Sequence, residues 1–256
     1  MKNHPLVERM VLEPSFFTGC NLRCVFCQNI DISKYMKGID VSIKRLSEIM
    51  LELQEKKVHN INLVTPTMFV PSIIKAIKIA RKKGLHIPIV YNSSGYENID
   101  TIKLLEGYID IYLPDFKYFD NDLAKKYSNV TNYVENAKEA LKEMVRQTGP
   151  CVFDGDIIKK GVIVRHLMLP TLLDDSKKII KYLYDTYHDD IYLSIMNQYT
   201  PNKEVKGTLK KIVKESDYNT LIDYAIEIGV NNAFCQIDGT QSDSFIPEFN
   251  YFGIRK

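Results

Sequence analysis

The stretch GCNLRCVFCQN, residues 19–29, places three of the five cysteines of the chain within eight residues. Cys20, Cys24 and Cys27 follow the spacing CxxxCxxC. Thiolates are soft ligands that select zinc, copper(I) or iron–sulfur clusters. A structural zinc site needs four ligands, and no histidine lies within thirty residues after Cys27. The spacing therefore predicts a [4Fe-4S] cluster with one open iron, and zinc or buried structural cysteines are the alternatives.

The other two cysteines do not indicate a second cluster. Cys151 and Cys235 are more than eighty residues apart, and an auxiliary cluster normally requires four thiolates of its own. Cys235 lies in the apolar run AFCQI, which is typical of a small buried side chain. We therefore expect one cluster.

Composition and charge exclude several broad classes. The net charge of +2 over 256 residues, with lysines interleaved among acidic residues, does not indicate a nucleic-acid-binding protein. The start MKNHPLVERMVLEP lacks the apolar core of a signal peptide, and no run of eighteen apolar residues indicates a membrane span. An odd number of cysteines fits a reducing compartment, so we expect a cytoplasmic protein.

Short β-branched or aromatic runs alternate with longer amphipathic segments, which is typical of βα units that build a parallel sheet. The predicted strands are residues 12–18, 61–65, 87–92, 108–114, 161–169, 191–196 and 231–237. The predicted helices are residues 42–57, 71–83, 99–105, 121–127, 134–148, 174–187 and 217–228, and a two-stranded excursion is predicted at 151–159.

Six βα steps are fewer than the eight of a closed barrel, so the fold class is α/β, a partial, open (β/α)6 TIM-type barrel. No Pro/Gly/Ser-rich linker divides the chain. We expect a single domain over residues 1–256, with a barrel core over about residues 12–200 and a C-terminal helix and strand extension over residues 201–256.

The cluster motif, with the aromatic Phe26 before its last cysteine, resembles the signature of the radical S-adenosylmethionine (SAM) enzymes. The context EPSFFTGCNLRCVFCQN is most similar to the activating enzymes of glycyl-radical enzymes, within them to the PflX-type homologues of pyruvate formate-lyase activating enzyme. The resemblance extends from about Glu13 to the C-terminal SFIPEF. It implies that the open iron is chelated by SAM, which is reductively cleaved to methionine and a 5′-deoxyadenosyl radical.

The resemblance also implies an oxidoreductase that abstracts hydrogen, with a glycyl Cα of a partner enzyme as the target. The implied partners are a flavodoxin or ferredoxin-type reductant and a protein or peptide substrate. Two alternatives differ in substrate or class: radical modification of a peptide or small metabolite, and a non-catalytic iron–sulfur electron carrier. Electron carriers of that kind are small and use four cysteines per cluster, whereas this chain has three at one site.

Barrel enzymes place their chemistry at the carboxyl ends of the strands. Thr65 and Pro66 stand there, where most family members have Gly-Gly-Glu that binds the amino group of SAM. The hydroxyls of Thr65 and Thr67, or the carbonyl freed by Pro66, are the expected substitutes, and a proline turn is the alternative. Asn92 and Ser94 follow the next strand. The activating enzymes have an acidic residue in place of Asn92 that helps bind a monovalent cation, so this cation is expected only if an amide oxygen suffices.

Charged residues follow the next two strands. Asp115 and Lys117 form the Asp-x-Lys pattern of the activating enzymes, in which both face SAM. Lys117 would neutralise the SAM carboxylate and Asp115 would hold its ammonium or a cation, and a surface ion pair is the alternative. Arg165 lies within the apolar run GVIVRHLMLP, where a charge is costly unless paired. Arg165 is therefore predicted to grip the SAM carboxylate bidentately.

The remaining candidates concern the adenosine part of SAM. The resemblance places Phe26 against the adenine. Gln198 and Tyr199 follow the sixth predicted strand, where family members often use a histidine for adenine or ribose contacts. Asn29, just past the cluster motif, either bonds the ribose or caps the following turn.

Overall fold

The structure is a computed structural model, and it describes residues 14–236. Within these residues, seven parallel strands form one open sheet in the order β1-β2-β3-β4-β6-β7-β8, and β5 pairs antiparallel with β6. The strands are β1 (Pro14–Phe16), β2 (Ile61–Val64), β3 (Ile89–Ser93), β4 (Ile111–Pro114), β5 (Val152–Asp154), β6 (Ile157–Leu167), β7 (Tyr192–Met196) and β8 (Ala233–Cys235). This confirms the open, partial barrel predicted from the sequence.

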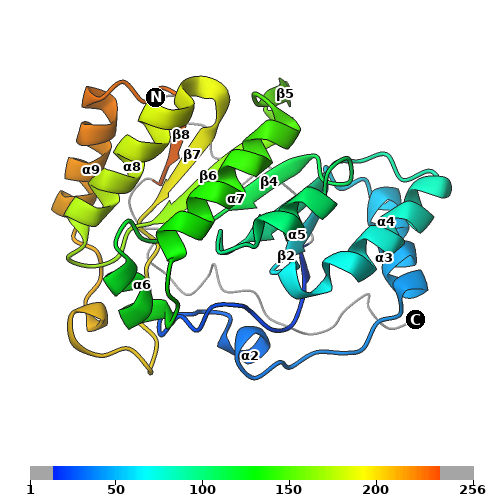
Figure 1. The fold of residues 1–256 in the computed structure, drawn as a ribbon, viewed down its shortest axis with the longest axis horizontal. Helices are drawn as coiled ribbons and strands as arrows, with labels where there is room; N and C mark the ends of the chain where they lie inside the picture. The colour runs from blue at the N-terminus through cyan, green and yellow to red at the C-terminus, as the bar shows by residue number, and fades with distance from the viewer. Residues whose placement is uncertain (1–13, 237–256) are drawn as a thin grey trace.

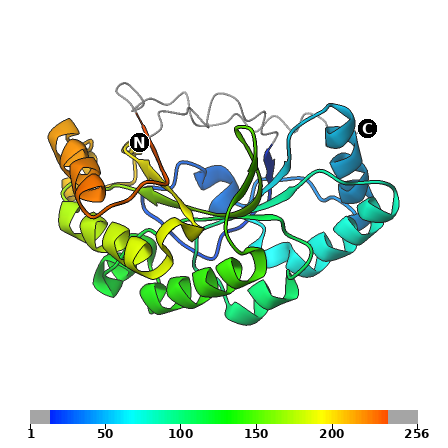
Figure 2. The ribbon, with the colours of Figure 1, turned by 90° about the horizontal axis from the view of Figure 1, so that it is seen from above.

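Apart from the short α2 (Ile30–Ser33), the helices lie in an arc along one side of the sheet (Figures 1 and 2). The helices of the arc are α3 (Ile43–Glu55), α4 (Val70–Lys82), α5 (Ile99–Leu104), α6 (Asn121–Ser128), α7 (Tyr133–Thr148), α8 (Leu173–Tyr187) and α9 (Glu215–Glu227). Three short 3-10 turns, η1 (Thr67–Phe69), η2 (His188–Asp190) and η3 (Gly207–Lys210), complete the described elements. None of the helices between residues 14 and 236 is both long and apolar enough to span a membrane.

Local sequence signals account for many helix ends. The Ser42 side chain accepts a hydrogen bond from Arg45 N at 3.1 Å, which caps the start of α3. Pro71 lies in the first turn of α4, where its missing N–H costs nothing. Helix α6 ends at Asn129, which adopts the left-handed conformation (φ 55°) that asparagine tolerates.

One predicted boundary between elements is wrong. The excursion at residues 151–159 and the strand at 161–169 are not separate, because β6 runs unbroken from the excursion into the barrel. Only Val152–Asp154 stands apart, as β5. The first strand, predicted over 12–18, is described only from Pro14, and residues 12 and 13 lie outside the described part of the chain.

The two faces of the sheet carry different side chains. On β3, Tyr91 packs edge-on against Tyr112 of β4 at 5.9 Å between ring centroids, within the large apolar core shared with the helices. The alternate residues Val90, Ile111 and Ile163 form a separate small cluster on the other, concave face. Asn92, Asp115 and Arg165 share this face further along their strands, so the register places polar groups above an apolar floor.

Candidate functional site

The three cysteines of the motif lie on the loop that joins β1 to α2, and each is partly buried. Cys24 Sγ lies 2.9 Å from Ser128 Oγ, and Cys27 Sγ lies 3.2 Å from Ser33 Oγ. Burial raises the pKa of the Cys24 thiol to about 11, and the positive charge of Lys117 opposes this rise. The Cys24 thiol is thus sheltered, and the Lys117 charge and the Ser128 hydroxyl oppose the effect of burial on it.

Three partly buried thiols on one loop are a donor set that fits three corners of an iron–sulfur cluster. Among residues 14–236, no three His, Cys, Asp or Glu side chains are placed to hold one metal ion. A mononuclear zinc site would need its sulfur ligands within about 4 Å of one another, given zinc–sulfur bonds of about 2.3 Å. Three thiols on one loop can instead contact three corners of a larger iron–sulfur cube and leave the fourth corner open.

The loop is held from one side by the end of α6. Arg23 N donates to Ser128 O at 3.0 Å, and Val25 N donates to Tyr127 O at 2.9 Å. The hydroxyls of Tyr118 and Ser128 are 2.6 Å apart, which fixes the group that contacts Cys24. The cluster loop therefore depends on a segment about a hundred residues away.

A network of charged and polar side chains lies on the concave face of the sheet, near the cysteines. Arg165 Nη2 lies 2.7 Å from both Asp115 Oδ1 and Asn92 Oδ1. Lys117 Nζ lies 2.6 Å from Asp115 Oδ2. The electrostatic interaction between Lys117 and Cys24 places this network next to the cluster loop. The structure thus brings the predicted Asn92, Asp115, Lys117 and Arg165 into one site.

This network carries an excess of one positive charge, because two cations surround one carboxylate. Burial raises the pKa of Asp115, but Arg165 and Lys117 outweigh it and leave the pKa below its ordinary value. Burial lowers the pKa of Lys117, but Asp115 and the Cys24 sulfur outweigh it and leave the pKa raised. Arg165 Nε is buried and has no hydrogen-bond partner in the described structure. The site therefore suits a further anion, such as a carboxylate.

The loop after β3 contacts both the cysteine-containing loop and the chain around the charged network. Ser94 Oγ donates to Asn21 Oδ1 at 3.1 Å, and Asn21 Nδ2 donates to Tyr96 O. Tyr133 OH contacts the carbonyls of Ser94 and Asp115 at 3.1 and 3.2 Å. Predicted Ser94 thus touches the cluster loop, while the oxygen of Asn92 that was expected to help bind a monovalent cation already accepts from Arg165.

Thr65 and Pro66 form a sharp corner after β2. Thr65 has φ +58°, which is unusual for a β-branched residue, and its N–H donates to Asn92 O at 2.9 Å. Thr67 Oγ1 donates to Glu97 Oε1 at 2.8 Å, and Tyr91 OH donates to Glu97 Oε2 at 3.3 Å. Because Tyr91 faces the helices, Glu97 supports this corner from the convex side of the sheet.

The adenosine candidates gather where the segment after β7 meets the cluster loop. Phe26 packs edge-on against Tyr199, with ring centroids 6.1 Å apart. Tyr199 OH donates to Leu209 O, and Gln198 Oε1 accepts from Gln236 Nε2 at 2.7 Å. Asn29 precedes α2 without capping it through its side chain, and its Oδ1 is buried without a partner in the described structure.

Sequence reasoning missed several residues that shape the site. They are serines, asparagines and a glutamate in loops or at helix ends, types that turns and surfaces use everywhere. Only contacts across the fold distinguish them. They are Asn21, Ser33, Glu97, Ser128 and Asn202.

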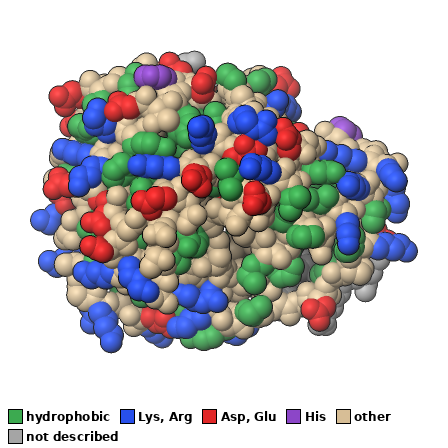
Figure 3. Space-filling view, in the orientation of Figure 1, with side chains coloured by type: hydrophobic (Ala, Val, Ile, Leu, Met, Phe, Trp, Pro, Cys, Tyr) green, Lys and Arg blue, Asp and Glu red, His purple; other side chains and the backbone are tan. Residues whose placement is uncertain are grey.

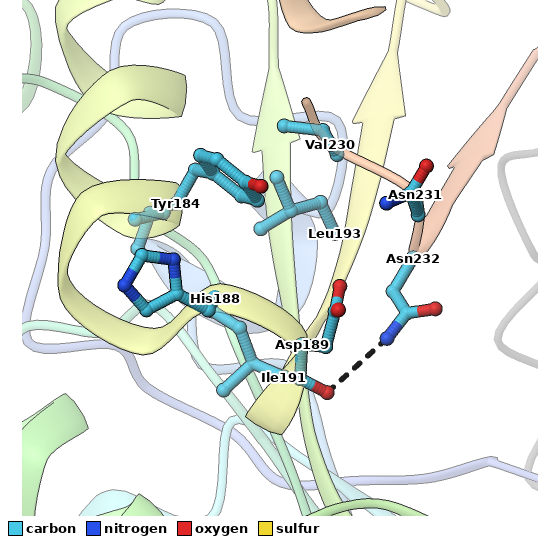
Figure 4. A pocket seen from close by; sticks show the side chains of 9 residues that line it. Tyr184, His188, Asp189, Ile191, Leu193, Val230, Asn231 and Asn232 are labelled. Carbon is cyan, nitrogen blue, oxygen red and sulfur yellow. Dashed lines mark hydrogen bonds between the residues drawn. The ribbon is translucent and has the colours of Figure 1, made fainter. Parts of the chain in front are cut away.

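A small hollow lies elsewhere, at the amino ends of β7 and β8 (Figure 4). It is lined by Tyr184, His188 and Asn232, among others, and Asn232 Nδ2 donates to Asp189 O at 3.1 Å. The cluster loop follows the carboxyl end of β1, so the hollow is at the wrong edge of the sheet for the cysteines. On the face shown in Figure 3, basic and acidic side chains are interspersed.

Comparisons with known proteins show the family of this chain. A model of the Radical SAM superfamily matches residues 15–183. An uncharacterized protein of Methanocaldococcus jannaschii is 32% identical over 214 residues, which cover 78% of this chain and 58% of that protein. A pyruvate formate-lyase-activating enzyme of Clostridium pasteurianum is 26% identical over 171 residues, which cover 65% of each. The chain spans less than two thirds of either relative.

Solved structures share the fold. Streptococcus suis SuiB bound to S-adenosylmethionine matches with a TM-score of 0.61 and 15% identity, over 93% of this chain and 53% of that one. Methylornithine synthase matches with a TM-score of 0.53 and 14% identity, over 92% of this chain and 77% of that one. At these identities the likeness concerns the fold.

Proposed function

This chain belongs to the radical SAM superfamily, and on that premise we propose that it binds one [4Fe-4S] cluster and SAM and activates a glycyl-radical enzyme. Hydrogen abstraction from a glycyl Cα of the partner is the proposed reaction. The relationship to pyruvate formate-lyase-activating enzymes supports this choice of substrate. The observation that carries the chemistry is the positively charged network of Arg165, Asp115 and Lys117, in which Lys117 interacts electrostatically with the Cys24 sulfur.

When bound, the cluster supplies the electron that cleaves SAM to methionine and a 5′-deoxyadenosyl radical, and a flavodoxin or ferredoxin-type protein would replenish it. Cys20, Cys24 and Cys27 would hold the cluster. Arg165 and Lys117 would bind the carboxylate of SAM, because together with Asp115 they leave one positive charge uncompensated.

Other residues would orient SAM. Thr65 and Pro66 would receive its amino group, since the strained backbone at Thr65 turns the corner beside Asn92. Phe26 and Tyr199 would provide an aromatic contact for the adenine, with Gln198, Asn29 and Ser94 as polar neighbours. We do not propose a monovalent cation, because Asn92 Oδ1 already accepts from Arg165.

Anaerobic reconstitution with iron and sulfide tests the first step. We expect a broad visible absorbance and, with dithionite, conversion of SAM to 5′-deoxyadenosine. Protein that takes up only zinc, or iron-loaded protein that leaves SAM intact, would refute the proposal.

The substrate is tested by deuterium transfer. Proteins of the source organism, grown with Cα-deuterated glycine, are incubated with the reduced enzyme and SAM. Deuterium in 5′-deoxyadenosine supports a glycyl target. Formation of 5′-deoxyadenosine that contains no deuterium would favour a small metabolite or another residue of a peptide as the substrate. The unusual Thr65–Pro66 and Asn92 segments favour this alternative.

A further inference from the structure

Asn202 lies on the segment that follows β7 and reaches back to the cluster loop. Its Nδ2 donates to two carbonyls of that loop, Val25 O and Cys27 O, at 3.1 Å each. Its Oδ1 accepts from Glu204 N at 2.9 Å, which fixes the orientation of the amide. The amide nitrogen of one partly buried side chain thus joins segments about 175 residues apart, while its oxygen is held within its own segment.

The two carbonyls bind a different segment of the chain from the loop groups that α6 holds. The end of α6 binds the loop through the N–H groups of Arg23 and Val25. Val25 therefore donates its N–H to one segment and accepts at its carbonyl from the other. Without Asn202, the carbonyls of Val25 and Cys27 would lose this donor, and the backbone around the last cysteine would lose its hydrogen bonds to the segment after β7.

The same segment carries the expected adenosine contacts. Tyr199 packs against Phe26 of the loop, and the Oγ1 of Thr200 is buried without a partner in the described structure. Glu204 accepts from Lys34 Nζ through both carboxylate oxygens at 3.0 Å, on the exposed side of the same contact. The two segments are thus joined by the partly buried amide of Asn202 and by an exposed ion pair between Glu204 and Lys34. A substitution can remove either contact and leave the other in place.

We propose that Asn202 is a positioning residue that fixes the cluster-binding loop through its two carbonyl contacts. This inference rests on the proposed function, because it requires a cluster on Cys20, Cys24 and Cys27. It predicts that the N–H groups of Asn202, and not the ion pair of Glu204 with Lys34, determine the rate of cluster loss. It also predicts that these N–H groups determine the arrangement of the loop around the cluster.

The test compares Asn202→Asp, Asn202→Ala and Glu204→Gln with the wild type after anaerobic reconstitution. Asn202→Asp keeps the shape and the acceptor for Glu204 N but replaces the donor with an oxygen. Glu204→Gln weakens the ion pair with Lys34 and leaves the Asn202 amide contact intact. The measurements are iron per protein, the rate of cluster loss to a chelator, the EPR signal of the reduced cluster without SAM, and the melting temperature of the metal-free proteins.

We expect cluster loss about tenfold faster in Asn202→Asp, with an intermediate rate in Asn202→Ala and a wild-type rate in Glu204→Gln. The EPR signal should change in the Asn202 variants, although the metal-free proteins melt like the wild type. Wild-type retention and an unchanged signal in Asn202→Asp would overturn the inference, as would equal losses in Glu204→Gln. Wild-type protein that binds no cluster would instead overturn the proposed function. If Asn202→Asp does not fold, Asn202→Ala alone decides between these outcomes.

Discussion

Replacing Arg165 with glutamine tests the charged network most directly. Arg165 Nη2 lies 2.7 Å from both Asp115 Oδ1 and Asn92 Oδ1, and both contacts would be lost. A hydrogen bond to a charged group contributes about 1.5–3 kcal/mol. Asp115 keeps Lys117 at 2.6 Å, so the free energy of unfolding should fall by about 2–3 kcal/mol rather than the roughly 3–5 kcal/mol of a fully broken buried pair.

The effect on SAM follows from the charge of the site. Arg165→Gln changes the network from one excess positive charge to neutral, which removes the expected partner of the SAM carboxylate. A loss of about 2 kcal/mol raises the dissociation constant roughly thirtyfold. Anaerobic calorimetry of the reconstituted protein measures this constant, and denaturant titration measures stability.

Arg146→Gln is the matched control for Arg165→Gln. It removes the same charge from a half-exposed position on α7, where Arg146 pairs with Glu143 and Glu106. We expect it to lower stability as well, because its partner Glu143 is buried, but to leave SAM binding unchanged. If SAM bound Arg165→Gln within about threefold of its wild-type affinity, Arg165 would not bind the carboxylate.

Three further predictions address the cluster, the corner after β2 and the loop after β3. Cys24→Ala should lose most reconstituted iron and all 5′-deoxyadenosine formation, whereas Cys235→Ala should keep both, as iron analysis and product assay will show. Burial raises the pKa of Glu97 from 4.5 to about 7, so the wild type should lose about 3 kcal/mol of stability between about pH 4.5 and 7. Glu97→Gln should lack this component, and parallel denaturation curves against pH for the two proteins would contradict the assignment. Gly95→Ala should destabilise the fold by more than about 2 kcal/mol, because Gly95 has φ +77° and an added Cβ would lie 1.9 Å from Asp115 O. A melting temperature equal to that of the wild type would show that the loop after β3 can move.

The elements were predictable where their signals are local. The alternation of β-branched runs and amphipathic segments is set by the periods of strands and helices, and it correctly indicated an open barrel. Ser42 and Pro71 marked helix starts because capping involves neighbours within one turn. The unbroken β6 was not predicted, since Asp154 and Gly155 indicate a turn but not how long the returning strand continues.

The sequence by itself determined the chemistry at the cluster loop, because three thiols at fixed spacing are neighbours in any fold. It also selected Arg165, whose charge within an apolar strand demands a partner. Only the tertiary structure decided what surrounds them. Ser128 beside Cys24 and Asn202 beside Cys27 come from segments about a hundred or more residues away, brought together by strand order and loop geometry. Hydrogen bonds across such distances leave no periodic trace in the chain, since any serine or asparagine can form them.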